Sequence, residues 1–71
     1  MKKILISDKL NPLCVEMFEK AGHTVDFKPG ISAEELLSII SDYNAILVRS
    51  RTKVTKEVIE AGKKLEIIGR A

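Results

Sequence analysis

The sequence predicts an α/β domain built around a parallel sheet. Short apolar runs alternate with amphipathic helical segments along the chain. Two runs, within residues 2–7 and 45–49, are apolar at odd and even positions alike, which is typical of strands buried on both faces of a parallel sheet. Polar residues follow both runs directly, and in open α/β sheets ligands bind at the carboxyl ends of strands. The same two strands therefore predict the core and the location of a site.

Composition limits the classes of function. The 71 residues suit one small domain, and a domain of this size removes only roughly 60% of its unfolded surface from water. A net charge of +2 is too small to indicate a nucleic acid or a membrane as partner. Asp8 and Lys9 interrupt the apolar run near the start, so we expect no signal peptide and a cytoplasmic protein. The single cysteine, Cys14, excludes an internal disulfide and a cysteine-based zinc site.

The first half of the chain predicts a helix at residues 12–21 and a strand at 23–28. Asn11 is a helix cap, Pro12 suits the first helical position, and Gly22 suits a left-handed helix end. The strand alternates apolar and polar residues, which indicates an edge of the sheet. The residues expected on the buried stripe of the helix are Cys14, Met17, Phe18 and Ala21.

The second half predicts two more helices and a fourth strand. Ser32 with Glu35 forms a capping box ahead of a helix at residues 33–41, and Thr55 caps a short helix at 56–61. A fourth strand contains Ile67 and Ile68 and ends at residues 69–71. The residues expected to be buried on the second helix are Ala33, Leu36, Leu37 and Ile40.

Right-handed crossovers arrange these elements as a partial flavodoxin-like sheet with strand order 2-1-3-4 and three helices. They put the first helix on one face and the other two helices on the opposite face. The first face is then half covered over the third and fourth strands, and an uncovered apolar face needs a partner. We expect either residues beyond Ala71 of a longer protein, which we favour, or a second copy in a homodimer.

The arginines indicate an anion site. Arg49, Arg51 and Arg70 lie next to predicted strand ends, and the other basic residues are scattered lysines. Because arginine binds carboxylate or phosphate with two parallel hydrogen bonds, we predict an anion site formed by Arg49, Ser50 and Arg70. The alternative is that these arginines are solvated or pair with Asp8. Arg51 and Lys53 are expected to be surface charges.

The remaining residues give no catalytic, cofactor or metal site. Cys14 lies on a helix stripe, where a thiol packs as a small apolar side chain, and His23 has no second histidine near it. No glycine-rich phosphate loop is present, so we expect the chain to bind no dinucleotide by itself. A phospho-receiver domain needs an aspartate where Arg49 stands, and a cysteine phosphotransferase needs its thiol closer to the first strand than Cys14.

Three segments, KKILISDKLNP, AILVRSRTKVT and LEIIGRA, resemble the amino-terminal part of the D-isomer-specific 2-hydroxyacid dehydrogenases. They are most similar to members that oxidise 3-phosphoglycerate to 3-phosphohydroxypyruvate in serine synthesis. The resemblance implies that residues 1–71 are a truncated flavodoxin-like substrate-binding lobe, and that a Rossmann lobe beyond it holds NAD. It also implies that Arg49 and Ser50 contact the substrate phosphate and that Arg70 is a second arginine near it.

The same resemblance implies that the general-acid histidine, its glutamate, the carboxylate-binding arginine and the NAD loop lie beyond Ala71. We therefore expect an inactive fragment of an NAD-dependent dehydrogenase that acts on a phosphorylated 2-hydroxy acid. A fragment of a related glyoxylate or hydroxypyruvate reductase is one alternative. A free-standing, non-enzymatic module that binds anions or forms oligomers is the other.

Overall fold

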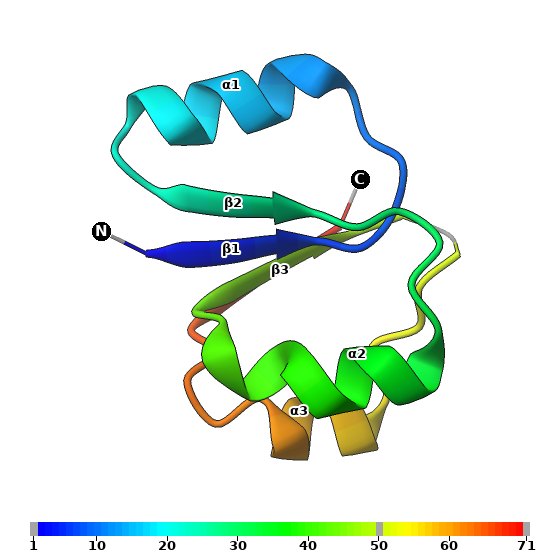
Figure 1. Ribbon diagram of the computed structural model, residues 1–71. Coiled ribbons are helices and arrows are strands. Elements are labelled where there is room, and N and C mark those ends of the chain that lie inside the picture. Colours follow the sequence, from blue (N-terminus) through cyan, green and yellow to red (C-terminus); the bar gives the residue numbers. More distant parts are fainter. Residues whose placement is uncertain (1, 50, 71) are drawn as a thin grey trace.

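The computed structural model describes residues 2–49 and 51–70 and contains one parallel sheet with strand order β2-β1-β3-β4, as predicted (Figure 1). Three α-helices and one 3₁₀ turn connect the strands. The elements in chain order are β1 (Lys3–Ile6), α1 (Pro12–Lys20), β2 (Thr24–Phe27), α2 (Ala33–Ile39), η1 (Ile40–Asp42), β3 (Ala45–Val48), α3 (Lys56–Ala61) and β4 (Ile67–Arg70).

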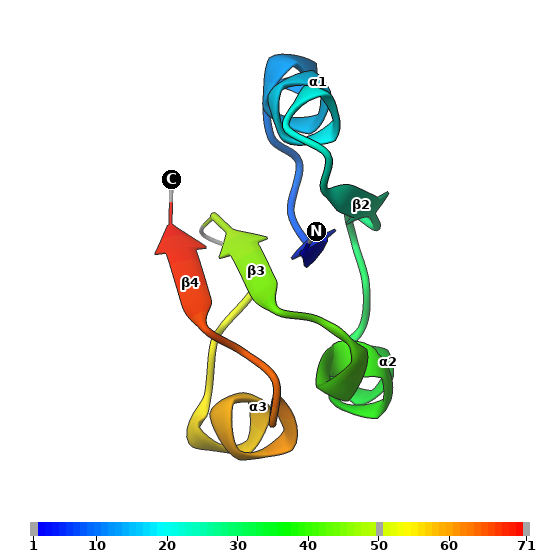
Figure 2. The same ribbon diagram turned by 90° about the vertical axis from the view of Figure 1, so that its left-hand side faces the viewer.

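The two doubly apolar runs form the interior strands, as their sequence predicts. β1 pairs with β3 in a register that sets Ile4 beside Ala45 and Leu5 beside Ile46. Because side chains alternate across a strand, even positions of β1 and odd positions of β3 face α1, and the others face α2 and α3. Figure 2 shows α1 on one side of the sheet and α2 with α3 on the other.

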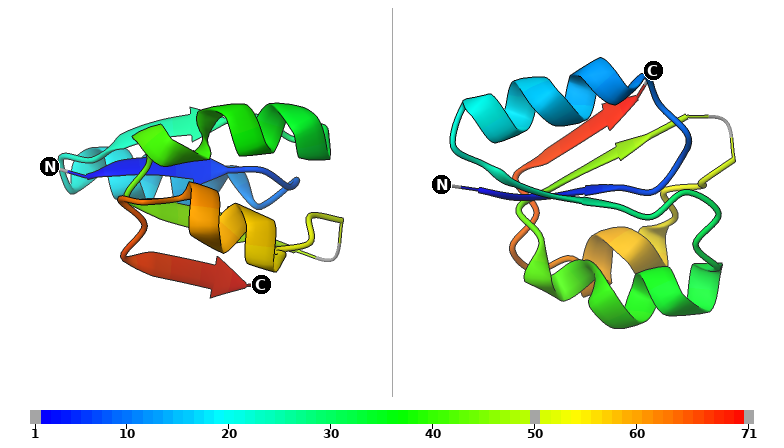
Figure 3. Two further views of the ribbon diagram at one scale, coloured as in Figure 1. Left: turned by 90° about the horizontal axis from the view of Figure 1, so that it is seen from below. Right: turned by 45° about the horizontal axis from the view of Figure 1, so that its top comes forward.

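The larger core of the protein lies under α2 and α3. Figure 3 shows these two helices beneath the sheet, with β4 at its edge. The buried side chains of this core are Leu5, Leu36, Ile40, Tyr43, Ile46, Val48 and Val58. The hydroxyl of Tyr43 donates a hydrogen bond to Asp26 Oδ2 at 2.6 Å. Burial first, and then the neighbouring carboxylates, raise the pKa of Tyr43 above its usual value, so this hydrogen bond persists across the neutral range.

The core under α1 is smaller and partly open. Its buried side chains are Ile4, Ile6 and Ala45, and Val15 and Phe18 of α1 pack against them. Figure 2 shows that α1 lies over β1 and β2 and leaves the same face of β4 uncovered. The half-covered face predicted from the crossovers is therefore present.

The predicted buried stripe of α1 is wrong at two positions. Met17 is 69% exposed and Ala21 is also exposed, whereas Cys14 and Phe18 are half-buried. Val15, which the spacing rule did not select, packs on the sheet in their place. The reason is that little of the sheet lies beneath α1, so a narrower stripe of the helix is covered than its amphipathic sequence offers.

The second helix also differs from its prediction. Leu36 and Ile40 are buried as expected, but Ala33 and Leu37 are exposed. The α-helix ends at Ile39, and the 3₁₀ turn η1 completes the segment that was expected to be α-helical to residue 41. A tighter last turn is a common way for a helix to end.

The predicted helix caps are confirmed. Side-chain oxygens of Asn11, Ser32 and Thr55 accept hydrogen bonds from backbone N–H groups in the first turns of α1, α2 and α3. At the end of α1, Gly22 has a φ of 90°. The N–H of Gly22 donates to Glu19 O and the N–H of His23 donates to Phe18 O, which is the Schellman arrangement.

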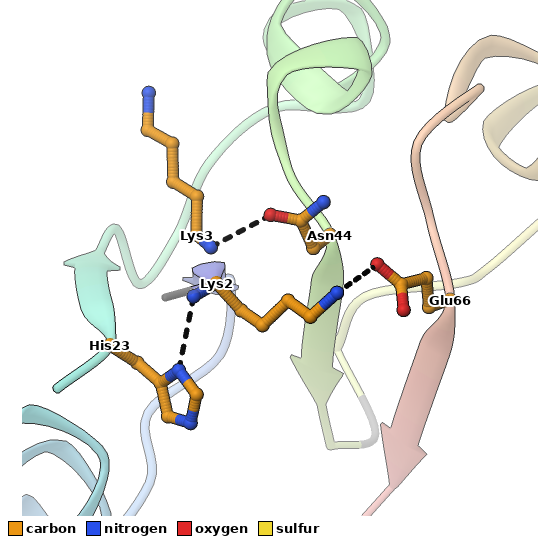
Figure 4. A network of polar contacts seen from close by, with 5 residues as sticks. All are labelled: Lys2, Lys3, His23, Asn44 and Glu66. Atoms are coloured by element: carbon orange, nitrogen blue, oxygen red, sulfur yellow. Dashed lines mark hydrogen bonds and ion pairs between the residues drawn. The ribbon is translucent and has the colours of Figure 1, made fainter. Parts of the chain in front are cut away.

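The amino edge of the sheet is held by a polar network (Figure 4). The backbone N–H of Lys2 donates to His23 Nδ1 at 3.1 Å, and the N–H of Lys3 donates to Asn44 Oδ1 at 2.9 Å. Lys2 Nζ forms an ion pair with Glu66 at 2.6 Å. These contacts join the start of β1 to the segments leading into the other three strands. Within the described ranges, no helix is long and apolar enough to cross a membrane.

Candidate functional site

The predicted site residues lie at the carboxyl edge of the sheet, opposite the polar network. Arg49 follows β3 directly, and Arg70 is the last residue of the neighbouring strand β4. Both side chains are exposed. Ser50, the third predicted residue, lies outside the described residues. The strand order therefore brings the two arginine-bearing strand ends side by side.

The two arginines line different hollows. The first, which we call the Arg49 hollow, is lined by Asp8, Lys9, Arg49 and Arg51. The second, the Arg70 hollow, is lined by Val48, Thr52, Lys53, Val54, Ile68 and Arg70. The guanidinium of Arg49 donates to the carbonyl oxygen of Lys9 at 3.3 Å, so it is directed toward the loop between β1 and α1. Each hollow carries at least two cationic side chains.

Asp8 connects β1 to the segment that follows β3. Its Oδ2 accepts the backbone N–H of Arg49 at 2.6 Å and the backbone N–H of Thr52 at 2.9 Å. Its Oδ1 accepts the hydroxyl of Thr52 at 2.7 Å, and that hydroxyl oxygen accepts the hydroxyl of Ser7 at 3.0 Å. Asp8 thus contacts the backbone of Arg49 and does not form an ion pair with its guanidinium group, which is directed to Lys9.

The carboxylate of Asp8 is ionised in this environment. Only 3% of the residue is exposed, and burial by itself raises the pKa of a carboxyl group. Hydrogen bonds from the side chain and backbone of Thr52, the backbone of Arg49 and the charge of Arg51 act in the opposite direction and prevail. The pKa of Asp8 is therefore lower than its ordinary value of 3.8. The site holds a fixed negative charge among its cations.

Sequence reasoning missed part of this arrangement. Arg51 and Lys53 were expected to be ordinary surface charges, and both are exposed, but each lines one of the two hollows. The sequence places Asp8 and the polar residues after β3, Thr52 among them, at the same edge, but it does not predict the hydrogen bonds between Asp8 and Thr52. The available signal was that two hydroxyl residues and one carboxylate, Ser7, Asp8 and Thr52, follow two strands expected to be neighbours.

His23 and Cys14, the other two side chains with possible chemistry, do not join this cluster. His23 is at the amino edge, where its ring is 6.4 Å from the ring of Phe18. Cys14 is a free, half-buried thiol in α1 that lines an apolar hollow with Phe18 and Leu47. Among the described residues, no group of three histidine, cysteine or acidic side chains could hold a metal ion.

Comparisons with known proteins agree with this fold. A sequence profile of the D-isomer specific 2-hydroxyacid dehydrogenase catalytic domain matches residues 4–71. Over all 71 residues the chain is 46% identical to the D-3-phosphoglycerate dehydrogenase of Sus scrofa, 42% to that of Synechocystis and 45% to that of Methanocaldococcus jannaschii. The chain spans 13% of the length of each of these relatives.

A solved structure gives the same result. The chain is similar to a Pyrococcus horikoshii protein known from a crystal structure, with a TM-score of 0.90 and 28% sequence identity. The match covers 99% of this chain and 21% of that protein. From the profile match, the sequence identities and the shared fold together, we conclude that the chain belongs to the D-isomer-specific 2-hydroxyacid dehydrogenase family.

Proposed function

We propose that this chain is part of a D-3-phosphoglycerate dehydrogenase and carries part of the site for the substrate phosphate. The main support is the 42–46% identity to D-3-phosphoglycerate dehydrogenases over the full chain. A second support is the cluster of cationic side chains at the carboxyl ends of β3 and β4. The proposed reaction of the parent enzyme is oxidation of 3-phosphoglycerate in serine synthesis, in the cytoplasm.

In this proposal Arg49, Ser50 and Arg70 bind the phosphate through their side chains. A phosphate monoester carries nearly two negative charges at neutral pH, and a guanidinium group offers two parallel N–H donors to its oxygens. A hydroxyl group at position 50 adds a donor. Because Arg49 and Arg70 line different hollows, a single phosphate that contacts both must lie between the carboxyl ends of β3 and β4.

NAD binding is assigned to a part of the parent enzyme outside these residues. A dinucleotide pyrophosphate binds where a glycine-rich turn meets free N–H groups at the start of a helix. Here the turn between β1 and α1 contains the Asp8 carboxylate, and α1 begins at Pro12, which has no N–H. The side chain of Asn11 already accepts the N–H of Leu13 at 3.0 Å. These residues do not fit a pyrophosphate, so the chain by itself is proposed to be catalytically inactive.

A ligand titration tests the site. Amide shifts of the 71-residue chain are followed while 3-phosphoglycerate is added, with D-glycerate as the matched ligand that lacks the phosphate. We expect the amides of residues 49–53 and Arg70 to shift with 3-phosphoglycerate and not with D-glycerate. Equal responses to the two ligands would favour a glyoxylate or hydroxypyruvate reductase as parent. Unchanged amides at millimolar 3-phosphoglycerate would contradict the phosphate site.

A control variant separates a site from general charge attraction. Arg49→Ala removes a proposed ligand, and Lys63→Ala removes one exposed positive charge from the segment after α3. We expect the first variant to weaken 3-phosphoglycerate binding by about tenfold or more, since a hydrogen bond to a charged group contributes about 1.5–3 kcal/mol. The second variant should bind as the original chain does. Equal losses would indicate nonspecific attraction.

A free-standing module is the second candidate function, in which a second copy of the chain would cover the uncovered sheet face. Ile67 in β4 and Met17 in α1 are 61% and 69% exposed on the side where the sheet lacks a second helix. Burial of this face between two copies would give a homodimer without any enzyme activity. A gene that continues past position 71 with a glycine-rich loop supports the dehydrogenase, and a stop codon supports the module.

A further inference from the structure

The contacts of Asp8 come from both ends of one short segment. Arg49 and Thr52 are three residues apart, and each donates its backbone N–H to the same oxygen, Oδ2 of Asp8. The Thr52 hydroxyl donates to the other oxygen. Asp8 is 41 and 44 positions away in sequence from these two residues. One buried carboxylate therefore fixes the start and the end of the segment that carries position 50.

Resting on the proposed function, we propose that Asp8, acting with Thr52, is the positioning residue of the phosphate site. It holds this segment so that the anion contacts side chains, and not the backbone N–H groups of Arg49 and Thr52. The backbone N–H groups of Arg49 and Thr52 already donate to Asp8, so they are not available to a ligand. In this segment the side chains of Arg49 and Arg51, which line the Arg49 hollow, carry the positive charge that a phosphate would contact.

Thr52 couples the two hollows. Its side chain lines the Arg70 hollow, while its hydroxyl and its backbone N–H bind Asp8, which lines the Arg49 hollow. These hydrogen bonds therefore fix the backbone of Arg49 relative to Thr52, which lines the same hollow as Arg70. Two cationic groups can bind one phosphate only if their separation is held, because each long side chain otherwise has many rotamers to lose.

The cost of burying Asp8 supports a role beyond packing. A buried charge is expensive unless it is hydrogen-bonded, and apolar replacements of buried charged groups are often as stable or more stable. Asp8 is 3% exposed, and its carboxylate accepts three hydrogen bonds from Arg49 and Thr52. An ionised carboxylate beside an anion site also repels the ligand, so it is unfavourable for binding unless its geometric effect is larger.

The test uses two matched pairs of variants of the 71-residue chain. Thr52→Val removes the hydroxyl with little change in shape, and Thr52→Ser keeps it. Asp8→Ala removes all contacts, and Asp8→Asn keeps a carbonyl oxygen for the two N–H groups while removing the charge. Glu60→Gln is the control, because it removes the same charge from an exposed position in α3. Dispersed amide spectra establish which variants are folded.

Two readouts are measured on each folded variant. Amide hydrogen exchange of Arg49 and Thr52 reports on the segment without any ligand, and Leu5 in β1 serves as an internal reference. Titration with 3-phosphoglycerate reports on the site. We expect Thr52→Val and Asp8→Ala to raise exchange at both amides and to weaken binding, each by about tenfold or more, the equivalent of one hydrogen bond to a charged group. Thr52→Ser and Glu60→Gln should match the original chain, and Asp8→Asn should be intermediate.

The outcomes separate this proposal from the proposed function. If exchange at the two amides is unchanged in Thr52→Val and Asp8→Ala, the positioning role is wrong whether or not the ligand binds. In a second outcome, the original chain binds 3-phosphoglycerate, while the two variants show faster exchange and the same affinity as the original. In that case the contacts are structural only, and the proposal is again wrong. If the original chain does not bind 3-phosphoglycerate while exchange responds as expected, the phosphate site fails, and the control of the segment by Asp8 stands.

Discussion

The two faces of the sheet differ in how completely they are covered. Among the described residues, the face under α2 and α3 buries seven apolar side chains in one cluster, whereas the face under α1 buries three. α1 itself has no fully buried residue, although its sequence is amphipathic. An apolar helix face becomes core only where enough of the sheet lies beneath it. Stability is expected to reside mainly on the α2 and α3 face.

The largest expected effect is from Ile46→Ala in β3. Ile46 is fully buried beneath α2 and α3, and such a truncation costs about 2–5 kcal/mol. In a chain this small that loss can unfold the domain, so Ile46→Val, with an expected cost of about 0.5–1.5 kcal/mol, is measured with it. Urea denaturation followed by circular dichroism gives both values. A loss below about 0.5 kcal/mol for Ile46→Ala would contradict the assignment of stability to this face.

Two glycines give a matched comparison of the faces. A Cβ at Gly62 would meet the side chain of Leu65 and lie 3.2 Å from the carbonyl oxygen of Val58, both on the α2 and α3 side. A Cβ at Gly69 would meet only the end of the flexible Leu47 side chain on the open side. We expect Gly62→Ala to cost about 1–3 kcal/mol through overpacking. Gly69→Ala should change the free energy of unfolding by less than about 1 kcal/mol. Equal costs in thermal denaturation would remove the contrast.

Asp8, buried at the end of the interior strand β1, is expected to make the stability of the chain depend on pH. Its pKa is lower in the folded chain than the ordinary 3.8, so its contribution to stability is present above that value. The contribution is lost as the pH falls through the lower folded pKa. Asp8→Asn should therefore be less stable than the original chain near neutral pH and show a smaller loss between about pH 6 and about pH 2. Parallel curves for the two chains, measured by urea denaturation, would show that Asp8 has no such linkage.

The smallest expected effect is from Met17→Ala in α1. Met17 is 69% exposed on the poorly covered side, and substitutions at exposed sites usually change stability by less than about 0.5 kcal/mol. Alanine also has the higher helix propensity. A cost above about 1 kcal/mol would mean that something covers this side chain in solution. Light scattering over a range of concentrations would then show whether the cover is a second copy of the chain.

The site could be predicted from the sequence only in outline. The doubly apolar strands and the right-handed crossovers place Arg49 and Arg70 at one edge, because the carboxyl ends of parallel strands lie together. The division of these arginines between two hollows could not be predicted, since it depends on side-chain directions at the strand ends. The contact of Asp8 with Thr52 joins residues 44 positions apart, and no local pattern specifies it.

Local sequence patterns are enough to predict the order of the elements, the interior position of β1 and β3, and the helix starts at Asn11, Ser32 and Thr55. Local propensity and apolar periodicity are enough for these features, because each depends on residues close in the chain. Only the tertiary structure decided which apolar residues of α1 are buried and that the Asp8 carboxylate binds the backbone after β3. Burial and long-range hydrogen bonding depend on which elements lie next to each other, and this packing is set when the whole sheet is assembled.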